Sequence, residues 1–255
     1  VHNNYFFLKK LSEHLDARLA GRQVCSVYSQ NKNELIISFV RNHDLFHIKA
    51  LLSPAFSCLS FPDTLTRARK NSVNLFEELI GKKILGVRQS ENDRSFILQA
   101  EDQYKLLFKL YGNRSNLILF HKDRNIKMFR NNLHADKALS VSGLDRKTKI
   151  DFESFKAIGG DYNQLSPAFG KDFDLYFLNN TYEGKSIEEK WAVFQELLKY
   201  LEDPEFCISS PDTIPVFRLF EDQGTFEKYS DPIEAQNRYF LLFTRTDHAD
   251  RLRLA

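Results

Sequence analysis

The chain has 255 residues and a mass of 29.8 kDa, with 42% hydrophobic and 27% charged residues. This length and composition allow one large or two modest folded domains, and they exclude collagen-like, low-complexity and disordered classes. Apolar runs such as Phe240–Phe243 are far shorter than the ~20 residues of a membrane-spanning helix. Charged residues near the N-terminus interrupt any apolar core of a signal peptide. We therefore expect a soluble protein with no membrane partner.

The three cysteines indicate the compartment. Cys25, Cys58 and Cys207 are odd in number, far apart and without C-x-x-C spacing. A disulfide framework is therefore not expected, and the sequence predicts three reduced cysteines in the cytoplasm, each a small apolar side chain that is buried or half-buried.

Charge is divided unevenly along the chain. Residues 1–150 contain 25 Lys and Arg against 14 Asp and Glu, whereas residues 151–255 contain 11 against 20. The balances are +11 and −9, which together give the net charge of +2. This division predicts two modules, of which the basic one faces a polyanion such as nucleic acid. A solvated basic face without any partner explains the same balance, because net charge concerns association in general.

The first 130 residues are predicted to form a β-rich α+β module. Four leucines at helical spacing predict a helix over residues 1–20. Alternating apolar residues then predict four strands, over Val24–Tyr28, Leu35–Phe39, Phe46–Leu51 and Cys58–Phe61. A second helix is expected from Thr64 to Ile80. Five further strands are expected over Ile84–Gln89, Ser95–Gln99, Tyr104–Leu110, Asn116–Phe120 and Ile126–Phe129.

The second half is predicted to be mainly helical. Residues 131–150 lose periodicity and are typical of a linker. Residues 151–255 then form the acidic module, with helices expected over Phe152–Ile158, Ala168–Leu178 and Ser186–Leu201 and from Pro232 onward. A small β-addition is expected over Ile214–Leu219 and Thr225–Tyr229.

Motifs of catalysis are missing from the sequence. It contains no Gly-rich phosphate loop and no nucleophile elbow, and its seven histidines are scattered. His43 and His47 have metal-ligand spacing for a helix, but His47 falls in a predicted strand. We therefore expect no enzyme activity, no cofactor or metal, and no small-molecule substrate.

Three polar segments stand out as candidate RNA-binding residues. Asp93 and Arg94 are adjacent at the start of a predicted strand, and an Arg can fork onto phosphate or stack on an unpaired base. Asn113 and Arg114 follow Gly112, which allows close backbone approach.

The third segment is the predicted helix that starts at Thr64. Arg67 and Lys70 would lie one helical turn apart and form a stripe of phosphate contacts. For each of the three segments, an ordinary turn or a solvated surface charge explains the residues as well.

Taken together, several segments resemble the N-terminal region of the NFACT family, which includes RqcH-like and NEMF-like proteins and older members named fibronectin-binding protein A-like. The segments that carry the resemblance occur in the family's order: His2–Phe7, Lys49–Pro54, Arg67–Ile80, Gly86–Arg94, Gly112–Phe120 and Leu165–Phe169. The resemblance covers nearly the whole chain.

The resemblance implies an N-terminal domain like that of formamidopyrimidine-DNA glycosylases, followed by a helix-hairpin-helix-like module. It also implies a role in ribosome quality control: members bind large ribosomal subunits that carry stalled peptidyl-tRNA and recruit tRNA for tailing of the nascent chain. The partners are then tRNA and rRNA. The family's Asp-Arg motif corresponds to Asp93 and Arg94, and the match around Gly112–Phe120 extends the implied site to Arg114.

Two departures leave alternatives open. The family continues into a coiled coil, which residues 250–255 are expected to begin, so this chain corresponds to an N-terminal region. The related glycosylases use an N-terminal Pro, whereas this sequence begins Val1-His2, so lyase chemistry is not expected. The alternatives are a fibronectin-binding adhesin and a protein that binds duplex DNA without cleaving it.

Overall fold

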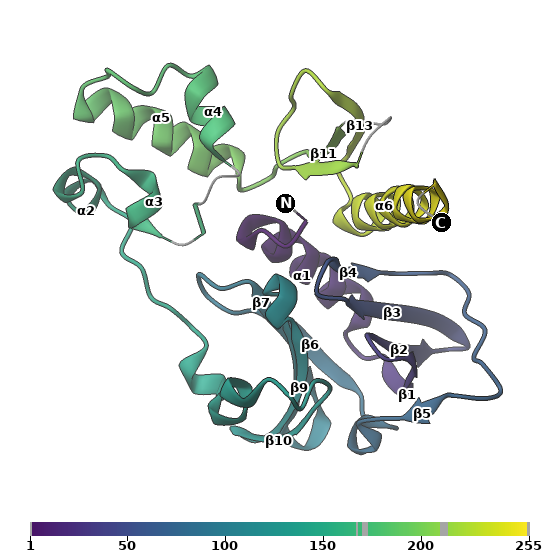
Figure 1. The fold of residues 1–255 in the computed structure, drawn as a ribbon. Helices are drawn as coiled ribbons and strands as arrows, with labels where there is room; N and C mark the ends of the chain where they lie inside the picture. Colours follow the sequence, from purple (N-terminus) through teal and green to yellow (C-terminus); the bar gives the residue numbers. More distant parts are fainter. Residues whose placement is uncertain (1, 167, 170–172, 210–213, 254–255) are drawn as a thin grey trace.

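The computed structural model describes residues 2–166, 168–169, 173–209 and 214–253 (Figure 1). The helices are α1 (Tyr5–Leu19), α2 (Phe152–Ala157), α3 (Tyr162–Leu165), α4 (Asp174–Asn179), α5 (Ile187–Tyr200) and α6 (Pro232–Arg253). The first ten strands are β1 (Gln23–Asn31), β2 (Glu34–Arg41), β3 (Asp44–Leu52), β4 (Ser57–Ser60), β5 (Val73–Asn74), β6 (Ile84–Gln89), β7 (Ser95–Ala100), β8 (Tyr104–Lys109), β9 (Asn116–His121) and β10 (Arg124–Met128). The last three are β11 (Phe206–Ser209), β12 (Val216–Arg218) and β13 (Thr225–Tyr229).

Two antiparallel five-stranded sheets form the N-terminal half, which confirms the α+β class. The first sheet has the order β4-β3-β2-β1-β5, and the second has the order β10-β9-β8-β7-β6. Backbone hydrogen bonds join the sheets at one corner, where Val24 N–H donates to Lys82 O and Ile84 N–H to Arg22 O, at 2.9 and 2.8 Å. All nine predicted strands of this half are present, because each is a short run rich in β-branched, leucine or aromatic residues between turn residues.

Helix α1 lies at the centre of the molecule. The Asn4 side chain caps it by accepting a hydrogen bond from Phe6 N–H at 2.8 Å. The four leucines of its apolar face, Leu8, Leu11, Leu15 and Leu19, are fully buried. The helix packs on β6 and β7 and also contacts α6 (Figure 1). The first and last helices of the chain therefore share one hydrophobic core.

The prediction of a helix from Thr64 to Ile80 is wrong. This segment is extended or irregular, with β5 and a short 3-10 helix, η1 (Glu77–Leu79). Asn71 and Phe76 adopt φ of +60° and +47°, which breaks any helical path. Because the segment is extended, Arg67 and Lys70 do not form a helical stripe, and Arg67 instead contacts Ser72 and Asn74.

Residues 131–150 pack against the outer face of the second sheet. Two short 3-10 helices, η4 (His134–Ala138) and η5 (Val141–Gly143), lie in this segment. Val141 and Leu144 are buried in a second apolar cluster. The sheet contributes Ile97, Leu107, Ile118, Phe120 and Met128 to that cluster. The segment read as a linker therefore contributes to the fold of the basic half.

The C-terminal half combines short helices with a small sheet. Helix α5 is confirmed, and Ser186 and Glu189 form the capping box at its start. The expected β-addition is present as β12 and β13, but sequence patterns missed the strand between them, β11, and also the one-turn helix α3. The helix predicted over Ala168–Leu178 overlaps α4, which begins at Asp174 and ends one residue later than predicted, at Asn179. Residues 170–172 and Pro167 fall outside the described part of the chain.

Helix α6 covers the free edge of the first sheet. The Asn237 side chain accepts a hydrogen bond from Phe61 N–H at 2.6 Å and donates one to Phe61 O at 3.0 Å, next to strand β4. Gln236 Nε2 donates to Cys58 Sγ at 3.0 Å within the same contact. These interactions tie the two halves of the chain together.

Candidate nucleic-acid interface

Asp93 is an internal anchor between two connections of the second sheet. Its carboxylate is buried at the start of β7 and accepts a hydrogen bond from the Tyr111 hydroxyl, which belongs to the β8–β9 connection. Arg146 Nε lies 3.6 Å from the other carboxylate oxygen, and its side chain is 58% exposed. Asp93 is therefore inaccessible to a large ligand and acts by holding its neighbours.

The turn that carries Asp93 is closely bonded to itself. Ser90 N–H donates to Ser95 O at 3.0 Å, and Ser95 Oγ donates to Ser90 Oγ at 2.9 Å between two buried side chains. Asn92 has a φ of +51°, a conformation that Asn adopts more readily than most residues. This backbone turns the buried Asp93 inward and leaves Arg94 exposed.

Arg94 is exposed and lies against an aromatic ring. Its guanidinium carbon is 5.4 Å from the centroid of the Tyr111 ring. Burial raises the pKa of Tyr111, and the neighbouring Asp93 carboxylate raises it further. The phenol thus stays protonated and keeps donating to Asp93, so the ring beneath Arg94 has a fixed orientation.

Lys109 approaches the same ring but is neutralised inside the protein. Its ammonium lies 5.0 Å from the Tyr111 ring centroid and forms an ion pair with Asp136. The Lys109 and Asp136 side chains are only 12% and 3% exposed. Asn116 Nδ2 also donates to Asp136, at 2.9 Å. This buried cluster supports Tyr111 from below and adds no free charge.

A second Asp-Arg dipeptide lies against the first. Asp145 accepts hydrogen bonds from Arg88 Nη1 at 2.8 and 3.1 Å and from Glu91 N–H at 2.9 Å. Arg146 donates its backbone N–H to Glu91 O at 3.0 Å and accepts from Asn92 Nδ2 at 2.8 Å. The interface therefore includes residues from the segment read as a linker. The sequence analysis did not identify them, and the dipeptide Asp-Arg does not single them out because it also occurs at Asp123-Arg124 and Asp250-Arg251.

The remaining predicted residues lie at two places. Asn113 and Arg114 belong to a 3-10 helix, η3 (Gly112–Arg114), directly after Tyr111, and both are exposed. The Asn113 carbonyl accepts a hydrogen bond from Arg130 Nη1 at 3.0 Å, which fixes this turn. Arg67 and Lys70 instead follow β4 of the first sheet. The structure thus brings Asp93, Arg94, Asn113 and Arg114 to the two connections that meet at Tyr111, whereas Arg67 and Lys70 lie after β4 of the other sheet.

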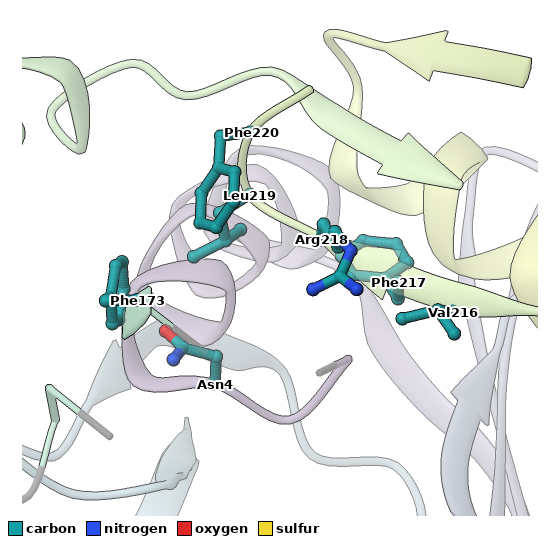
Figure 2. A pocket seen from close by; sticks show the side chains of 7 residues that line it. All are labelled: Asn4, Phe173, Val216, Phe217, Arg218, Leu219 and Phe220. Atoms are coloured by element: carbon teal, nitrogen blue, oxygen red, sulfur yellow. The ribbon is translucent and has the colours of Figure 1, made fainter. Parts of the chain in front are cut away.

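Two further features of the described residues are a cavity near the start of α1 and the distribution of metal-ligating side chains. A small cavity of about 40 Å³ lies between Asn4, Phe173 and the segment Val216–Phe220 (Figure 2). A cavity needs ~10–15 Å³ for one water, so this volume suits only a few waters. Within the described ranges, no group of three His, Cys, Asp or Glu could hold a metal ion, and no helix is long and apolar enough to cross a membrane.

Comparisons with known proteins establish the fold. No family model and no curated protein matches the chain. The fibrinogen-binding protein from Staphylococcus aureus matches with a TM-score of 0.68 at 15% identity, over 94% of this chain and 99% of that one. The N-terminal region of the fibronectin/fibrinogen-binding protein from Streptococcus suis matches with a TM-score of 0.67 at 14% identity, over 93% and 98%. The N-terminal domain of a fibronectin-binding protein from Streptococcus pneumoniae matches with a TM-score of 0.54 at 16% identity, over 94% and 98%. The chain thus has the fold of these N-terminal domains.

Proposed function

We propose that this chain is the RNA-binding module of a cytoplasmic ribosome quality-control factor of the NFACT type. In this role it binds large ribosomal subunits that carry stalled peptidyl-tRNA and helps to recruit tRNA, without catalysing a reaction itself. The proposal includes a glycosylase-like N-terminal domain and a helix-hairpin-helix-like module. The observation that carries it is the exposed Arg94, which lies on the Tyr111 ring that buried Asp93 holds in place.

This geometry suits RNA because it presents a pre-ordered guanidinium. An Arg can bind a phosphate through two parallel hydrogen bonds or stack on an unpaired base. Fixing the side chain in advance lowers the conformational entropy that binding costs. Arg114 and Arg146 are exposed next to it and can contact neighbouring phosphates, and residues 1–150 carry a net charge of +11.

The first test measures tRNA binding by the purified chain at several salt concentrations. We expect Arg94→Ala to weaken tRNA binding by about 10-fold or more. An Arg that binds a phosphate or stacks on a base contributes ~1–3 kcal/mol to the binding free energy. Arg124→Ala is the matched control, because Arg124 is equally exposed but lies on the edge strand β10. It removes the same charge and should have only a small effect.

The melting temperature separates binding from folding. An exposed Arg contributes little to stability, so Arg94→Ala should melt like the wild type. A clearly lower melting temperature would mean that Arg94 has a structural role and that its assignment to RNA is wrong. Equal losses for Arg94→Ala and Arg124→Ala would indicate general attraction to a polyanion.

The second test addresses the ribosome. Large subunits, either empty or carrying peptidyl-tRNA, are sedimented with the wild type and with an Asp93→Ala, Arg94→Ala double variant, and the recovered tRNA is sequenced. Retention on occupied subunits and tRNA enrichment that the double variant loses would support the proposal. Binding that is equal on both subunit types and disappears with salt would contradict it. Competition by duplex DNA would then test the DNA-binding alternative.

A second candidate function comes from the names of the structural neighbours. Those proteins are described as binding fibronectin or fibrinogen, and they share the fold of this chain. Immobilised fibronectin and fibrinogen provide the test. Saturable binding that persists in Arg94→Ala and resists competition by tRNA would favour the adhesin function over the RNA-binding function.

A further inference from the structure

A second arginine is held in a fixed position on the other sheet. Arg67 Nε donates to Ser72 Oγ at 2.7 Å, and Nη2 donates to Asn74 Oδ1 at 2.8 Å. Its guanidinium carbon lies 4.5 Å from the centroid of the buried Tyr28 ring. Despite these contacts Arg67 is exposed. Like Arg94, it is a cation seated on a tyrosine ring.

The loop around Arg67 is itself tied to the sheet. Ala68 N–H donates to the Gln30 side chain at 3.0 Å, and Leu75 N–H donates to Val27 O at 3.0 Å. Strand β5 pairs with β1 on the far side of the loop. The guanidinium is therefore ordered before any ligand arrives, which lowers the entropic cost of binding.

An open cavity of about 390 Å³ lies beside this arginine. This volume falls within the ~300–1,000 Å³ that is typical of small-molecule sites. Its lining includes the exposed, apolar side chain of Ile80 and two charged groups, Arg67 and Glu77. Among the residues that the structure describes, Arg67 forms no ion pair with a carboxylate. Its charge is thus available to a ligand.

We propose that this cavity binds one unpaired nucleotide. The phosphate pairs with the Arg67 guanidinium, and the base packs on the exposed Ile80 side chain. The Glu77 carboxylate accepts a hydrogen bond from an exocyclic amino group, which adenine, cytosine and guanine have and uracil lacks. The site lies on the first sheet, separate from the Arg94 interface on the second sheet (Figure 1). That this nucleotide belongs to an RNA strand, which is the RNA form of the proposal, rests on the proposed function.

The test uses labelled single-stranded oligonucleotides of cytidine and of uridine, with nucleoside monophosphates as competitors. We expect the cytidine oligonucleotide to bind more tightly, and Arg67→Ala to weaken its binding by about 10-fold, as for loss of a stacking or phosphate contact. Arg69→Ala is the matched control, because Arg69 is exposed in the same loop. Arg67→Lys keeps the charge but lacks the planar fork, and it should also bind weakly. Glu77→Gln should reduce the preference for cytidine over uridine.

Cys25 gives a readout that needs no substitution in the site. It is exposed and lines the same cavity. We expect a bound cytidine oligonucleotide to slow its alkylation by N-ethylmaleimide, and a Cys25→Ser variant identifies the modified thiol. An unchanged alkylation rate under saturating oligonucleotide would overturn the proposal even if Arg67→Ala folds poorly.

Parallel assays with Arg94→Ala distinguish this inference from the proposed function. If Arg67→Ala and Arg69→Ala bind the oligonucleotide equally while Arg94→Ala still loses tRNA, the nucleotide site is wrong and the RNA function stands. If neither Arg67→Ala nor Arg94→Ala differs from its control, both are wrong. If monophosphates protect Cys25 and the oligonucleotide does not, the occupant is a free nucleotide, and the RNA form is overturned.

Discussion

The most informative perturbation of the fold is Asp136→Ala, which removes the carboxylate beneath the candidate interface. Asp136 pairs with Lys109 where both side chains are almost fully buried. It also accepts a hydrogen bond from Asn116 at 2.9 Å. The substitution leaves the Lys109 ammonium and one amide hydrogen of Asn116 without their carboxylate partner inside the protein.

The expected loss follows from this geometry. Removing one partner of a buried ion pair costs about 3–5 kcal/mol, because the other charge stays desolvated. At ~2–4 °C per kcal/mol for a chain of this size, the melting temperature should fall by roughly 6–20 °C. Unfolding in urea, followed by circular dichroism, measures the difference in free energy.

A double substitution tests the reason for the loss. Replacing Lys109 by Met together with Asp136 by Leu removes both charges, so the double variant should be far more stable than Asp136→Ala. The reasoning would be refuted if Asp136→Ala lost less than ~1 kcal/mol, since that result would mean that Lys109 reaches solvent in the variant.

Two further predictions concern single hydrogen bonds. Ser186→Ala removes half of the capping box, in which Ser186 Oγ accepts a hydrogen bond from Glu189 N–H at 3.2 Å. The free energy of unfolding in urea should fall by about 1 kcal/mol. Ser186→Thr should retain most of this stability, and an equal loss in both variants would contradict the capping role. Asp93→Asn removes a negative charge that raises the pKa of Tyr111, so that pKa should fall in an absorbance titration of the phenolate. Tyr111→Phe identifies the transition, and a pKa that is unchanged in Asp93→Asn would show that burial alone sets it.

Local patterns predicted most of the N-terminal fold. The strands were predicted from short apolar runs between turn residues, and α1 from the helical period of its leucines. Helix α5 was predicted because its apolar stripe begins at a capping residue. The same reasoning failed between Thr64 and Ile80. The apolar spacing there fits a helix, but the β5–β1 pairing and the left-handed Phe76 determine the path. Strand β11 was missed although its four residues are all buried, as are those of β4, which was predicted.

The candidate interface was only partly visible in the sequence. Arg94 and Arg114 could be named from their own neighbours, since each follows a turn signal. Tyr111 and Arg146 could not, because their roles come from contacts across 18 and 53 positions with Asp93. The buried pair of Lys109 and Asp136 likewise depends on a segment whose composition is that of a loop.

The two hydrogen bonds between the Phe61 backbone and the Asn237 side chain can form only after α6 has been synthesised. The two residues are 176 positions apart. At ~5–20 residues per second, translation takes roughly 9–35 s to reach Asn237 after Phe61 is made. During that interval strand β4 has an unpaired edge, which is a template for pairing with another chain. Helix α6, which contacts β4, therefore covers this edge only after the rest of the chain has been made.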